Sequence, residues 1–376
     1  MRERTRIAYL VHDLNDPAVA RRILMLRAAG ADVVAAGFRR GERAPDAVAG
    51  APAVDLGRTA DGRLAQRAAM VAANLLRPAA MLEAARGADV VMARNLESLA
   101  LAARARRAAP GARLVYECLD IHRSLLGRSI PARAVQRVEA RLLRGIDLLV
   151  VSSPAFLREH FEKRPSLSAP ALLVENKLLA LDGPPPVPKS PPPGPPWTIG
   201  WFGNLRCRRT LDALRGVARA GGGRVRVLVA GRPSPAEFAD LPALVAAEPH
   251  MDYAGPFAPA DLPALYGRCH FAWAVDWFEE GLNSSWLLPN RLYEAGALGA
   301  VPIALRNVET GRWLAAHGAG LLLDDDDPAA RLRGVLDGLD EAAYRRMREA
   351  VAAIPRGALV ATAADCGALL AAVAGR

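Results

Sequence analysis

The chain has 376 residues, of which 52% are hydrophobic and 5% aromatic. This length is too great for one ordinary core and fits two domains of average size. No stretch holds the roughly 18 uncharged apolar residues of a membrane span, and the first residues lack the apolar core of a secretory signal, so we expect a soluble, cytoplasmic protein.

Short apolar strands alternate with amphipathic helices along the first half of the chain, which is typical of parallel α/β units. Strands are expected at Ile7–Val11, Val33–Ala36, Val90–Ala93, Arg113–Glu117, Leu148–Ser152 and Leu172–Glu175. Helices are expected between them, among others at Ala18–Ala29, Glu97–Ala108, Ala132–Leu143 and Pro154–Phe161.

A proline-rich run at 182–196 interrupts this pattern. Proline lacks the N–H that helices and central strands need, so the run predicts a stiff connector. After it the alternation restarts, with strands expected at Thr198–Phe202, Val225–Ala230, Met251–Tyr253, Phe271–Ala274, Val301–Ala304 and Gly320–Leu323. The last helices are expected near Glu341–Ile354 and Leu359–Val373.

The predicted fold is therefore α/β, with two Rossmann-like domains facing each other across a cleft. The first domain spans residues 1–181, and the connector covers 182–196. The second domain spans 197–357 and would bind a nucleotide, and a C-terminal helix at 358–376 is expected to pack back on the first. Ligands of open α/β folds bind at the carboxyl ends of the strands, which predicts the cleft as the site.

Two common uses of such domains are disfavoured by the glycine pattern. The turn after the first strand, residues 11–17, contains no glycine, so its backbone cannot approach a dinucleotide pyrophosphate in the usual way. The Gly221–Gly223 run precedes a strand instead of following one, and no phosphate-binding P-loop pattern occurs. These observations argue against nicotinamide-dependent dehydrogenases and P-loop kinases.

The most informative stretch is residues 281–304, which predicts a polar loop, a helix that opens near Pro289, a stop at Gly299 and a strand. Arg291 and Glu294 are three residues apart and share one helix face. A helix N-terminus with an adjacent arginine suits a diphosphate, and the glutamate can accept hydrogen bonds from a ribose. The loop offers further polar groups to a phosphate or sugar, at Asn283, Ser284, Ser285 and Asn290. The alternative is an ordinary Arg–Glu surface pair.

The segment that starts at Glu294 and runs to Ala304 resembles the donor-site helix of GT-B glycosyltransferases. The resemblance implies that Glu294 holds the nucleotide ribose and that Arg291 contacts the diphosphate. It also implies a sugar-nucleotide co-substrate, with UDP favoured by its frequency in that group, and an acceptor held by the first domain, residues 1–181. Large family 4 transferases carry a second glutamate where this chain has Trp286, which leaves open whether the anomeric configuration is inverted or retained.

A second motif covers Ile199–Arg209 at the first strand of the second domain. Gly203 and Asn204 allow a tight turn close to a ligand, and Arg206 and Arg209 follow just before a helix. The motif is similar to the glycine-rich loop and arginine that GT-B enzymes direct at the donor diphosphate. A solvated arginine cluster is the alternative, and it is favoured for Arg208.

Candidate catalytic residues follow two strands of the first domain. Asp120 and His122 come directly after the strand at Arg113–Glu117, where an ionised aspartate can accept a proton from an acceptor hydroxyl. The segment resembles a Tyr-x-x-His-Asp stretch of related transferases, with Leu119 at the histidine position. Asp13, with His12 after the first strand, is a rival acid–base group. A capping aspartate and a packed histidine are the alternative interpretation.

Charge is unevenly distributed: residues 1–200 hold 30 Lys or Arg against 19 Asp or Glu, and residues 201–376 hold 19 against 20. Four arginines of the helix near 132–143 share one face, which suits an anionic membrane surface at roughly 1 kcal/mol per basic residue. They are Arg133, Arg137, Arg141 and Arg144. A solvated helix face is the alternative. No aromatic-rich basic stripe is present, so no nucleic-acid partner is expected.

No metal site is expected. The four cysteines are far apart without metal-ligand spacing, and Asp324–Asp327 precede Pro328 as helix-capping carboxylates.

Taken together, these motifs predict a glycosyltransferase that uses a nucleotide-diphosphate sugar and a glycan or lipid-linked acceptor in bacterial surface polysaccharide assembly. A sugar-nucleotide epimerase on the same fold and a non-enzymatic basic binding protein are the alternatives.

Overall fold

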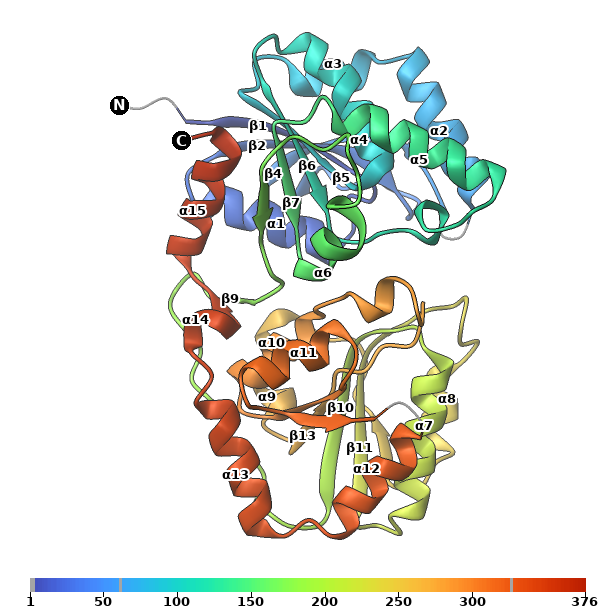
Figure 1. Cartoon of the computed structure of the whole chain (residues 1–376), viewed down its shortest axis with the longest axis vertical. Helices are drawn as coiled ribbons and strands as arrows, with labels where there is room; N and C mark the ends of the chain where they lie inside the picture. Colours follow the sequence, from blue (N-terminus) through green and yellow to red (C-terminus); the bar gives the residue numbers. More distant parts are fainter. Residues whose placement is uncertain (1–3, 61–62, 325–326) are drawn as a thin grey trace. The chain divides into compact units, whose positions relative to one another are not determined.

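The computed structural model describes residues 4–60, 63–324 and 327–376. These residues form two compact units (Figure 1). Unit 1 comprises residues 1–175 and 362–376, and unit 2 comprises residues 176–361. Each unit contains a parallel sheet with helices on its faces, so the predicted pair of Rossmann-like domains is confirmed.

Unit 1 is built on a sheet whose strand order is β3-β4-β2-β1-β5-β6-β7-β8. All neighbouring strands run parallel except β3 and β4, which form an antiparallel edge. The strands are β1 Arg6–Val11, β2 Asp32–Arg39, β3 Ala47–Val48, β4 Ala51–Arg58, β5 Val90–Arg94, β6 Arg113–Cys118, β7 Leu148–Val151 and β8 Ala171–Leu173. The central strands are buried along nearly their whole length, as expected for a parallel sheet covered on both faces.

Helices connect the strands of unit 1 and cover its sheet (Figure 1). They are α1 Pro17–Ala28, α2 Leu64–Leu76, α3 Ala79–Ala85, α4 Asn95–Ala105, η1 Arg106–Ala108, η2 Arg123–Leu125, α5 Ile130–Leu143, α6 Pro154–Phe156, the π-helical turn η3 Leu157–Phe161 and α15 Ala363–Ala374. Side chains cap several of them at the N-terminus. Asp16 accepts from the Ala18 N–H, Ser129 caps α5, and a proline follows each of these caps.

Unit 2 has a second parallel sheet, with the order β12-β11-β10-β13-β14-β15. Its strands are β10 Trp197–Leu205, β11 Val225–Pro233, β12 Met251–Tyr253, β13 Phe271–Trp273, β14 Val301–Leu305 and β15 Leu321–Leu323, and a separate parallel pair joins β9 Leu178–Leu179 to β16 Val360–Ala361. The helices are α7 Arg208–Ala220, α8 Leu241–Ala246, η4 Pro259–Asp261, α9 Leu262–Tyr266, η5 Asn283–Ser285, α10 Asn290–Ala297, α11 Glu309–Ala316, α12 Pro328–Asp337, α13 Glu341–Ala352 and α14 Arg356–Leu359.

The chain passes between the units at residues 175–176 and 361–362. The proline-rich run at 182–196, expected to be the connector, therefore lies within unit 2. Carbonyl groups attach this run to unit 2, because a proline has no N–H donor but keeps its carbonyl acceptor. Arg356 donates to the Pro185 carbonyl at 3.1 Å, and His270 Nε2 lies 2.9 Å from the Pro192 carbonyl. Helix α15 belongs to unit 1 and packs on α1.

The expected strands and the main expected helices occur in the structure with end points shifted by a few residues. The β3–β4 edge and the helices α2 and α3 were not predicted. Strand β4 carries Pro52 and Gly57 and buries few of its side chains, which removes the apolar signal of a strand. The four cysteines are buried and free.

Candidate active site

In unit 2 the strand order reverses at β10, because β11 lies on one side of it and β13 on the other. Loops that leave such neighbouring strands diverge and open a crevice at their carboxyl ends. The backbone is close-packed there. Gly203 has a φ of 114° and Gly231 a φ of 137°, and a Cβ on Gly231 would lie 1.8 Å from the Gly203 carbonyl oxygen. Only glycine fits at this position of β11.

Asp276, which follows β13, gathers two arginines at this crevice. Its Oδ2 lies 3.7 Å from an Nη2 atom of Arg206, after β10, and 3.6 Å from Nη2 of Arg291, on α10. Its Oδ1 accepts from the Phe278 N–H at 2.9 Å and from the Ser284 hydroxyl at 3.5 Å. The carboxylate thus holds two half-buried guanidinium groups at long ion-pair distances.

One hydrogen-bond donor of Arg291, its Nε, has no partner among the described residues. Its Nη2 donates to the Val275 carbonyl at 3.0 Å, and only 12% of its side chain is exposed. Its Nε is buried and has no hydrogen-bond partner among the described residues. A buried donor without a partner costs free energy unless a ligand or water satisfies it.

Glu294 lies one turn further along α10 and has a different partner. Its Oε2 accepts from the Tyr266 hydroxyl at 3.1 Å. Burial and then the charge of Glu294 raise the pKa of Tyr266 well above its usual range, so the phenol stays protonated and donates. Arg291 and Glu294 therefore do not form the exposed surface pair that was the alternative; both side chains are half-buried.

The loop before α10 contributes polar groups that are already engaged. Asn283 and Ser284 in η5 are buried, and the Ser284 hydroxyl accepts from the Glu279 N–H at 2.9 Å. Ser285 is half-buried beside them. Pro289 and Asn290 open α10, and no side chain caps its first turn. Within that turn the Leu292 N–H donates to the Pro289 carbonyl at 3.0 Å.

The other arginines after β10 lie further out. Arg209 forms an ion pair with Glu280 and stacks over the Trp277 ring at 4.4 Å. Arg208 donates to the Glu237 carbonyl at 2.6 Å, which fits the solvated alternative favoured for it. Asn204 is exposed at the end of the same strand. Of the arginines in this motif, Arg206 is the one that joins Asp276.

In unit 1 the predicted catalytic residues lie in separate local arrangements. Asp13 is 5% exposed, accepts from the Asn15 N–H at 3.0 Å and lies 3.3 Å from Arg40 Nε. Asp120, in the loop after β6, is exposed. His122 Nδ1 lies 2.9 Å from the Ser124 hydroxyl, and burial, followed by the charge of Arg67, lowers the pKa of His122.

A buried ionic cluster lies behind these residues, within the sheet of unit 1. Glu117 on β6 is fully buried, and Arg22 Nε and Arg94 Nε donate to it at 2.5 and 3.0 Å. The Tyr9 hydroxyl also donates to Glu117. Burial alone would raise the pKa of Glu117, but the charges of Arg94 and Arg22 lower it to about 2. Arg94 also lies 3.8 Å from Asp16, the cap of α1.

Comparison with known proteins identifies the family. Residues 17–176 match the model of the glycosyl transferase 4-like domain. The chain is 45% identical over 372 residues to the succinoglycan biosynthesis protein ExoL of Rhizobium meliloti (strain 1021), which covers 97% of this chain and 92% of that protein. The chain belongs to the family 4-like glycosyltransferases. The predicted resemblance and enzyme class are therefore confirmed.

Solved structures show that this glycosyltransferase has the GT-B fold. HepE of Anabaena, in complex with UDP and glucose, superposes with a TM-score of 0.69 at 15% identity and covers 99% of both chains. Sucrose-phosphate synthase of Thermosynechococcus elongatus superposes with a TM-score of 0.66 at 17% identity, over 97% of this chain and 98% of that one.

Sequence reasoning missed Asp276 and Tyr266, the partners of the glycosyltransferase's Arg206, Arg291 and Glu294. The available signal was positional: Asp276 is a carboxylate that directly follows a buried strand, where ligands of this fold bind. The ionisable residues within apolar strands, Tyr9 and Glu117, were a second unused signal.

Within the described residues, no cluster of three or more His, Cys, Asp or Glu is arranged to hold a metal ion. Asp327 caps α12 as expected, and Asp324 forms an ion pair with Arg306. The remaining two carboxylates of that run, at 325–326, lie outside the described residues. No helix in the described part of the chain is long and apolar enough to cross a bilayer.

Proposed function

We propose that this glycosyltransferase moves a sugar from a UDP-sugar to a glycan or lipid-linked acceptor in bacterial surface polysaccharide assembly. Its relative ExoL is named for succinoglycan biosynthesis, and HepE has been solved with UDP-glucose. The observation that carries the proposal is the convergence of Arg206 and Arg291 on Asp276 at the strand-order reversal of unit 2.

In this proposal the donor diphosphate takes over the two arginines from Asp276. Ion pairs of 3.6 and 3.7 Å are longer than charge-assisted hydrogen bonds of about 2.7–2.9 Å, so diphosphate oxygens at closer range would gain from the exchange. The Nε of Arg291, which has no hydrogen-bond partner among the described residues, is a further donor, and the N-terminus of α10, which no side chain caps, favours an anion. The further predicted donor contacts are Gly203, Asn204, Arg209, Asn283, Ser284, Ser285, Pro289 and Asn290.

Glu294 is proposed to accept hydrogen bonds from the ribose diol. The Tyr266 hydroxyl occupies one carboxylate oxygen and fixes the orientation of the side chain, and a carboxylate has further acceptor positions for a ligand. This division of labour assigns the donor to unit 2 and the acceptor to unit 1. Hydrogen exchange of the full chain should slow on adding UDP in β10, the 275–285 loop and α10.

For the transfer step we propose an inverting displacement with Asp120 as the base. Asp120 accepts the proton of the acceptor hydroxyl, the hydroxyl oxygen bonds to the anomeric carbon, and the bond from that carbon to the diphosphate oxygen breaks. Arg206 and Arg291 then stabilise the charge that develops on the leaving UDP. The exposure of Asp120 supports its access to an acceptor, whereas Asp13 is buried against Arg40.

Asp120→Asn keeps the shape of the side chain and removes the base, so turnover should fall by roughly 10²–10⁴ with little change in UDP affinity. Asp13→Asn and His122→Gln test the two rival groups in the same assay. Near-normal turnover of Asp120→Asn, or a product that retains the donor's anomeric configuration, would contradict this step.

Product analysis tests the proposed function itself. Incubation with UDP-glucose and a glycan or lipid-linked acceptor should release UDP and glycosylate the acceptor at matching rates. A changed sugar on intact UDP-sugar, formed without acceptor, would instead identify an epimerase. If neither a panel of UDP-sugars nor UDP alone binds, the proposal is wrong.

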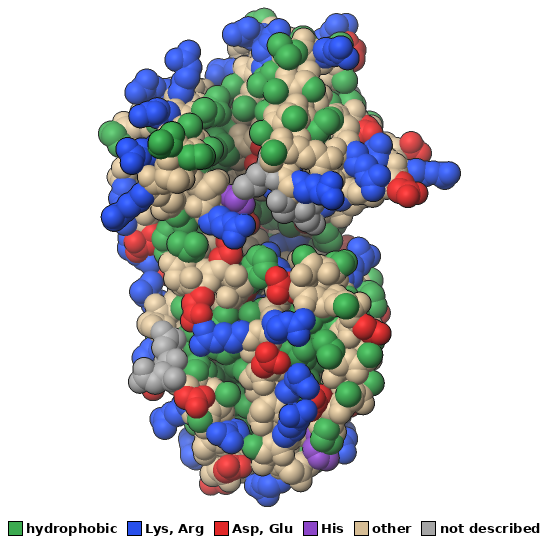
Figure 2. All heavy atoms as spheres, turned by 90° about the vertical axis from the view of Figure 1, so that its right-hand side faces the viewer, with side chains coloured by type: hydrophobic (Ala, Val, Ile, Leu, Met, Phe, Trp, Pro, Cys, Tyr) green, Lys and Arg blue, Asp and Glu red, His purple; other side chains and the backbone are tan. Residues whose placement is uncertain are grey.

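We further propose that unit 1 rests on an anionic membrane. Helices α2 and α5 lie on the side of unit 1 that Figure 2 turns to the viewer, where hydrophobic side chains are bordered by Lys and Arg. Leu76, Ile130 and Val138 are 82%, 81% and 50% exposed, and α5 carries the exposed arginine face. Anionic liposomes should pull the protein down at low salt and release it at high salt. Equal binding to neutral and anionic liposomes would contradict it.

A further inference from the structure

Unit 1 contains a basic pocket that the donor and base assignments do not use. Its volume is about 490 Å³. It lies where the segments after β6 and β7 meet, between η2, the start of α5 and the π-helical turn η3. The lining residues are Leu125, Leu126, Gly127, Arg128, Arg133, Gln136, Glu159, His160, Lys163 and Arg164. Four of them are permanently cationic and one is acidic, so the pocket favours an anion.

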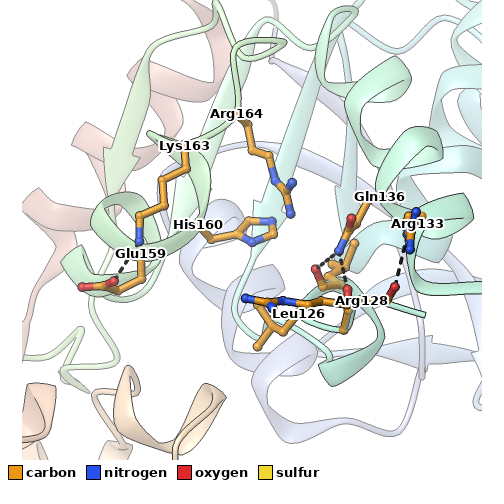
Figure 3. Close-up of a pocket in the computed structure, with 10 residues that line it drawn as sticks. Leu126, Arg128, Arg133, Gln136, Glu159, His160, Lys163 and Arg164 are labelled. Carbon is orange, nitrogen blue, oxygen red and sulfur yellow. Dashed lines mark hydrogen bonds and ion pairs between the residues drawn. The ribbon is translucent and has the colours of Figure 1, made fainter. Parts of the chain in front are cut away.

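The wall formed by residues 125–128 is fixed to α5 by hydrogen bonds. Gln136 Nε2 donates to the carbonyls of Leu125 and Gly127 at 2.8 and 3.0 Å, and Arg133 Nε donates to the Arg128 carbonyl at 3.2 Å (Figure 3). The backbone that carries Arg128 is thereby held in place. Preorganised cations lose less entropy when they bind a ligand.

The opposite wall is anchored by a buried acid. Glu139 on α5 is fully buried, its Oε1 lies 2.8 Å from His160 Nε2, and its Oε2 lies 3.4 Å from Arg164 Nε. The Arg164 contact is an ion pair, because neither its Nε nor Glu139 Oε2 has a hydrogen-bond partner among the described residues, and Arg164 also lines the pocket. Figure 3 shows the side chains of Arg128 and Arg164 extending into the space between the two walls.

Lys163 is the fourth cationic residue that lines the pocket. It donates to Glu159 at 3.1 Å, an exposed pair that water screens and that a ligand can rearrange. His160 belongs to the π-helical turn η3, and Arg164 comes three residues after its end at Phe161. π-Helical turns frequently occur at functional sites. Arginines from two elements, facing a common space, match the several oxygens of a phosphate better than a single carboxylate.

We propose that this basic pocket binds a phosphoryl group, as a monophosphate or diphosphate. Arg128 and Arg133 contact it from the α5 side, and Lys163 and Arg164 contact it from the η3 side. We assign this phosphoryl group to the acceptor substrate, and that assignment rests on the proposed function. The binding of a phosphate by the pocket does not depend on it. A sugar phosphate in solution and a lipid phosphate headgroup both supply this chemistry.

The test uses the full chain saturated with UDP, so that the site in unit 2 is occupied, and measures binding of inorganic pyrophosphate by calorimetry. We expect one pyrophosphate per chain, and a loss of affinity of roughly 10- to 100-fold in Arg128→Gln or Lys163→Gln, as for one charge-assisted contact. Both residues are exposed, so neither substitution threatens the fold. Arg137→Gln is the matched control, because Arg137 is an exposed arginine of α5 outside the pocket.

Absence of pyrophosphate binding to the wild-type chain would overturn the proposal. An equal loss in Arg137→Gln and Arg128→Gln would do the same, because it would show general attraction to a basic surface. Equal affinity for succinate would overturn the assignment to a phosphate. UDP affinity is measured in the same variants and should not change; failure of UDP to bind the wild type contradicts the proposed function and not this pocket.

A second experiment distinguishes a sugar phosphate in solution from a lipid phosphate headgroup as the ligand of the pocket. Glucose 1-phosphate and vesicles of phosphatidic acid are compared, at equal phosphate concentration, as competitors of bound pyrophosphate. Displacement by the sugar phosphate alone assigns a soluble acceptor, and displacement by the vesicles alone assigns a lipid headgroup. Displacement by neither would overturn the proposal.

Discussion

Each unit contains a carboxylate between two arginines, but the two clusters differ in burial and distance. In unit 1 Glu117 is fully buried, with arginine donors at 2.5 and 3.0 Å. In unit 2 Asp276 is 13% exposed, with Arg206 and Arg291 at 3.7 and 3.6 Å. In the buried cluster the oxygens of Glu117 are engaged by Arg22, Arg94 and Tyr9, which joins strands β1, β5 and β6 of the sheet. The looser, half-open cluster can exchange its carboxylate for a substrate anion.

The largest expected effect is on the buried cluster. Glu117→Gln removes the charge that compensates Arg22 and Arg94, and breaking a buried pair in this way should lower the free energy of unfolding by about 3–5 kcal/mol. Urea denaturation of the full chain measures the change. Glu97→Gln is the control, because its ion pair with Arg67 is partly exposed and should contribute at most about 1 kcal/mol. Equal losses would remove the distinction between the clusters.

The same cluster predicts a dependence of stability on pH. The folded pKa of Glu117, about 2, lies below the ordinary glutamate value of 4.5, so its contribution is complete above that value and is lost as the pH falls toward 2. The shift corresponds to roughly 3 kcal/mol. Unfolding midpoints measured between pH 6 and pH 2 should fall less steeply in Glu117→Gln than in the wild type. Parallel curves for the two proteins would contradict the assignment.

In unit 2 the expected effect is on binding. Arg291→Ala removes one proposed diphosphate contact and should weaken UDP binding roughly 10- to 100-fold, because a charge-assisted contact contributes about 1.5–3 kcal/mol. Because Arg291 also donates to the Val275 carbonyl, urea denaturation checks that the variant is folded under the conditions of the binding assay. Arg306→Ala is the matched control, since Arg306 forms an exposed pair with Asp324 in the same unit. Calorimetry with UDP measures both, and wild-type affinity in Arg291→Ala would remove the donor assignment.

In unit 2 the sequence identifies the candidate donor-site residues but not the carboxylate that they contact. Glycine turns, a proline at the start of α10 and apolar strands mark local structure, so Gly203, Arg206 and Arg291 are found from short-range patterns. Asp276 lacks such a signal, because its role depends on two arginines 70 residues before it and 15 after it in sequence. A contact of that range is decided by strand order, which the alternation of strands and helices does not specify.

The sequence is less informative about unit 1 for the same reason. Asp13, Asp120 and His122 were placed correctly after strands, but their exposure and partners depend on how the loops fold. Glu117 and Tyr9 stand in apolar strands, and only the pairing of β1, β5 and β6 brings their side chains to Arg94. The basic pocket likewise needs Gln136 and Glu139, whose hydrogen bonds hold the two walls.

The most direct test of the account is the UDP affinity of Asp276→Asn. If the diphosphate replaces the Asp276 carboxylate as the partner of Arg206 and Arg291, the charge of Asp276 competes for these arginines and repels the ligand. Two unit charges about 4 Å apart interact by about 1 kcal/mol in water, so the variant should bind UDP roughly fivefold more tightly. A gain in affinity cannot result from misfolding. Weaker UDP binding in Asp276→Asn would show that the carboxylate positions the arginines, and would contradict the exchange on which the donor site is built.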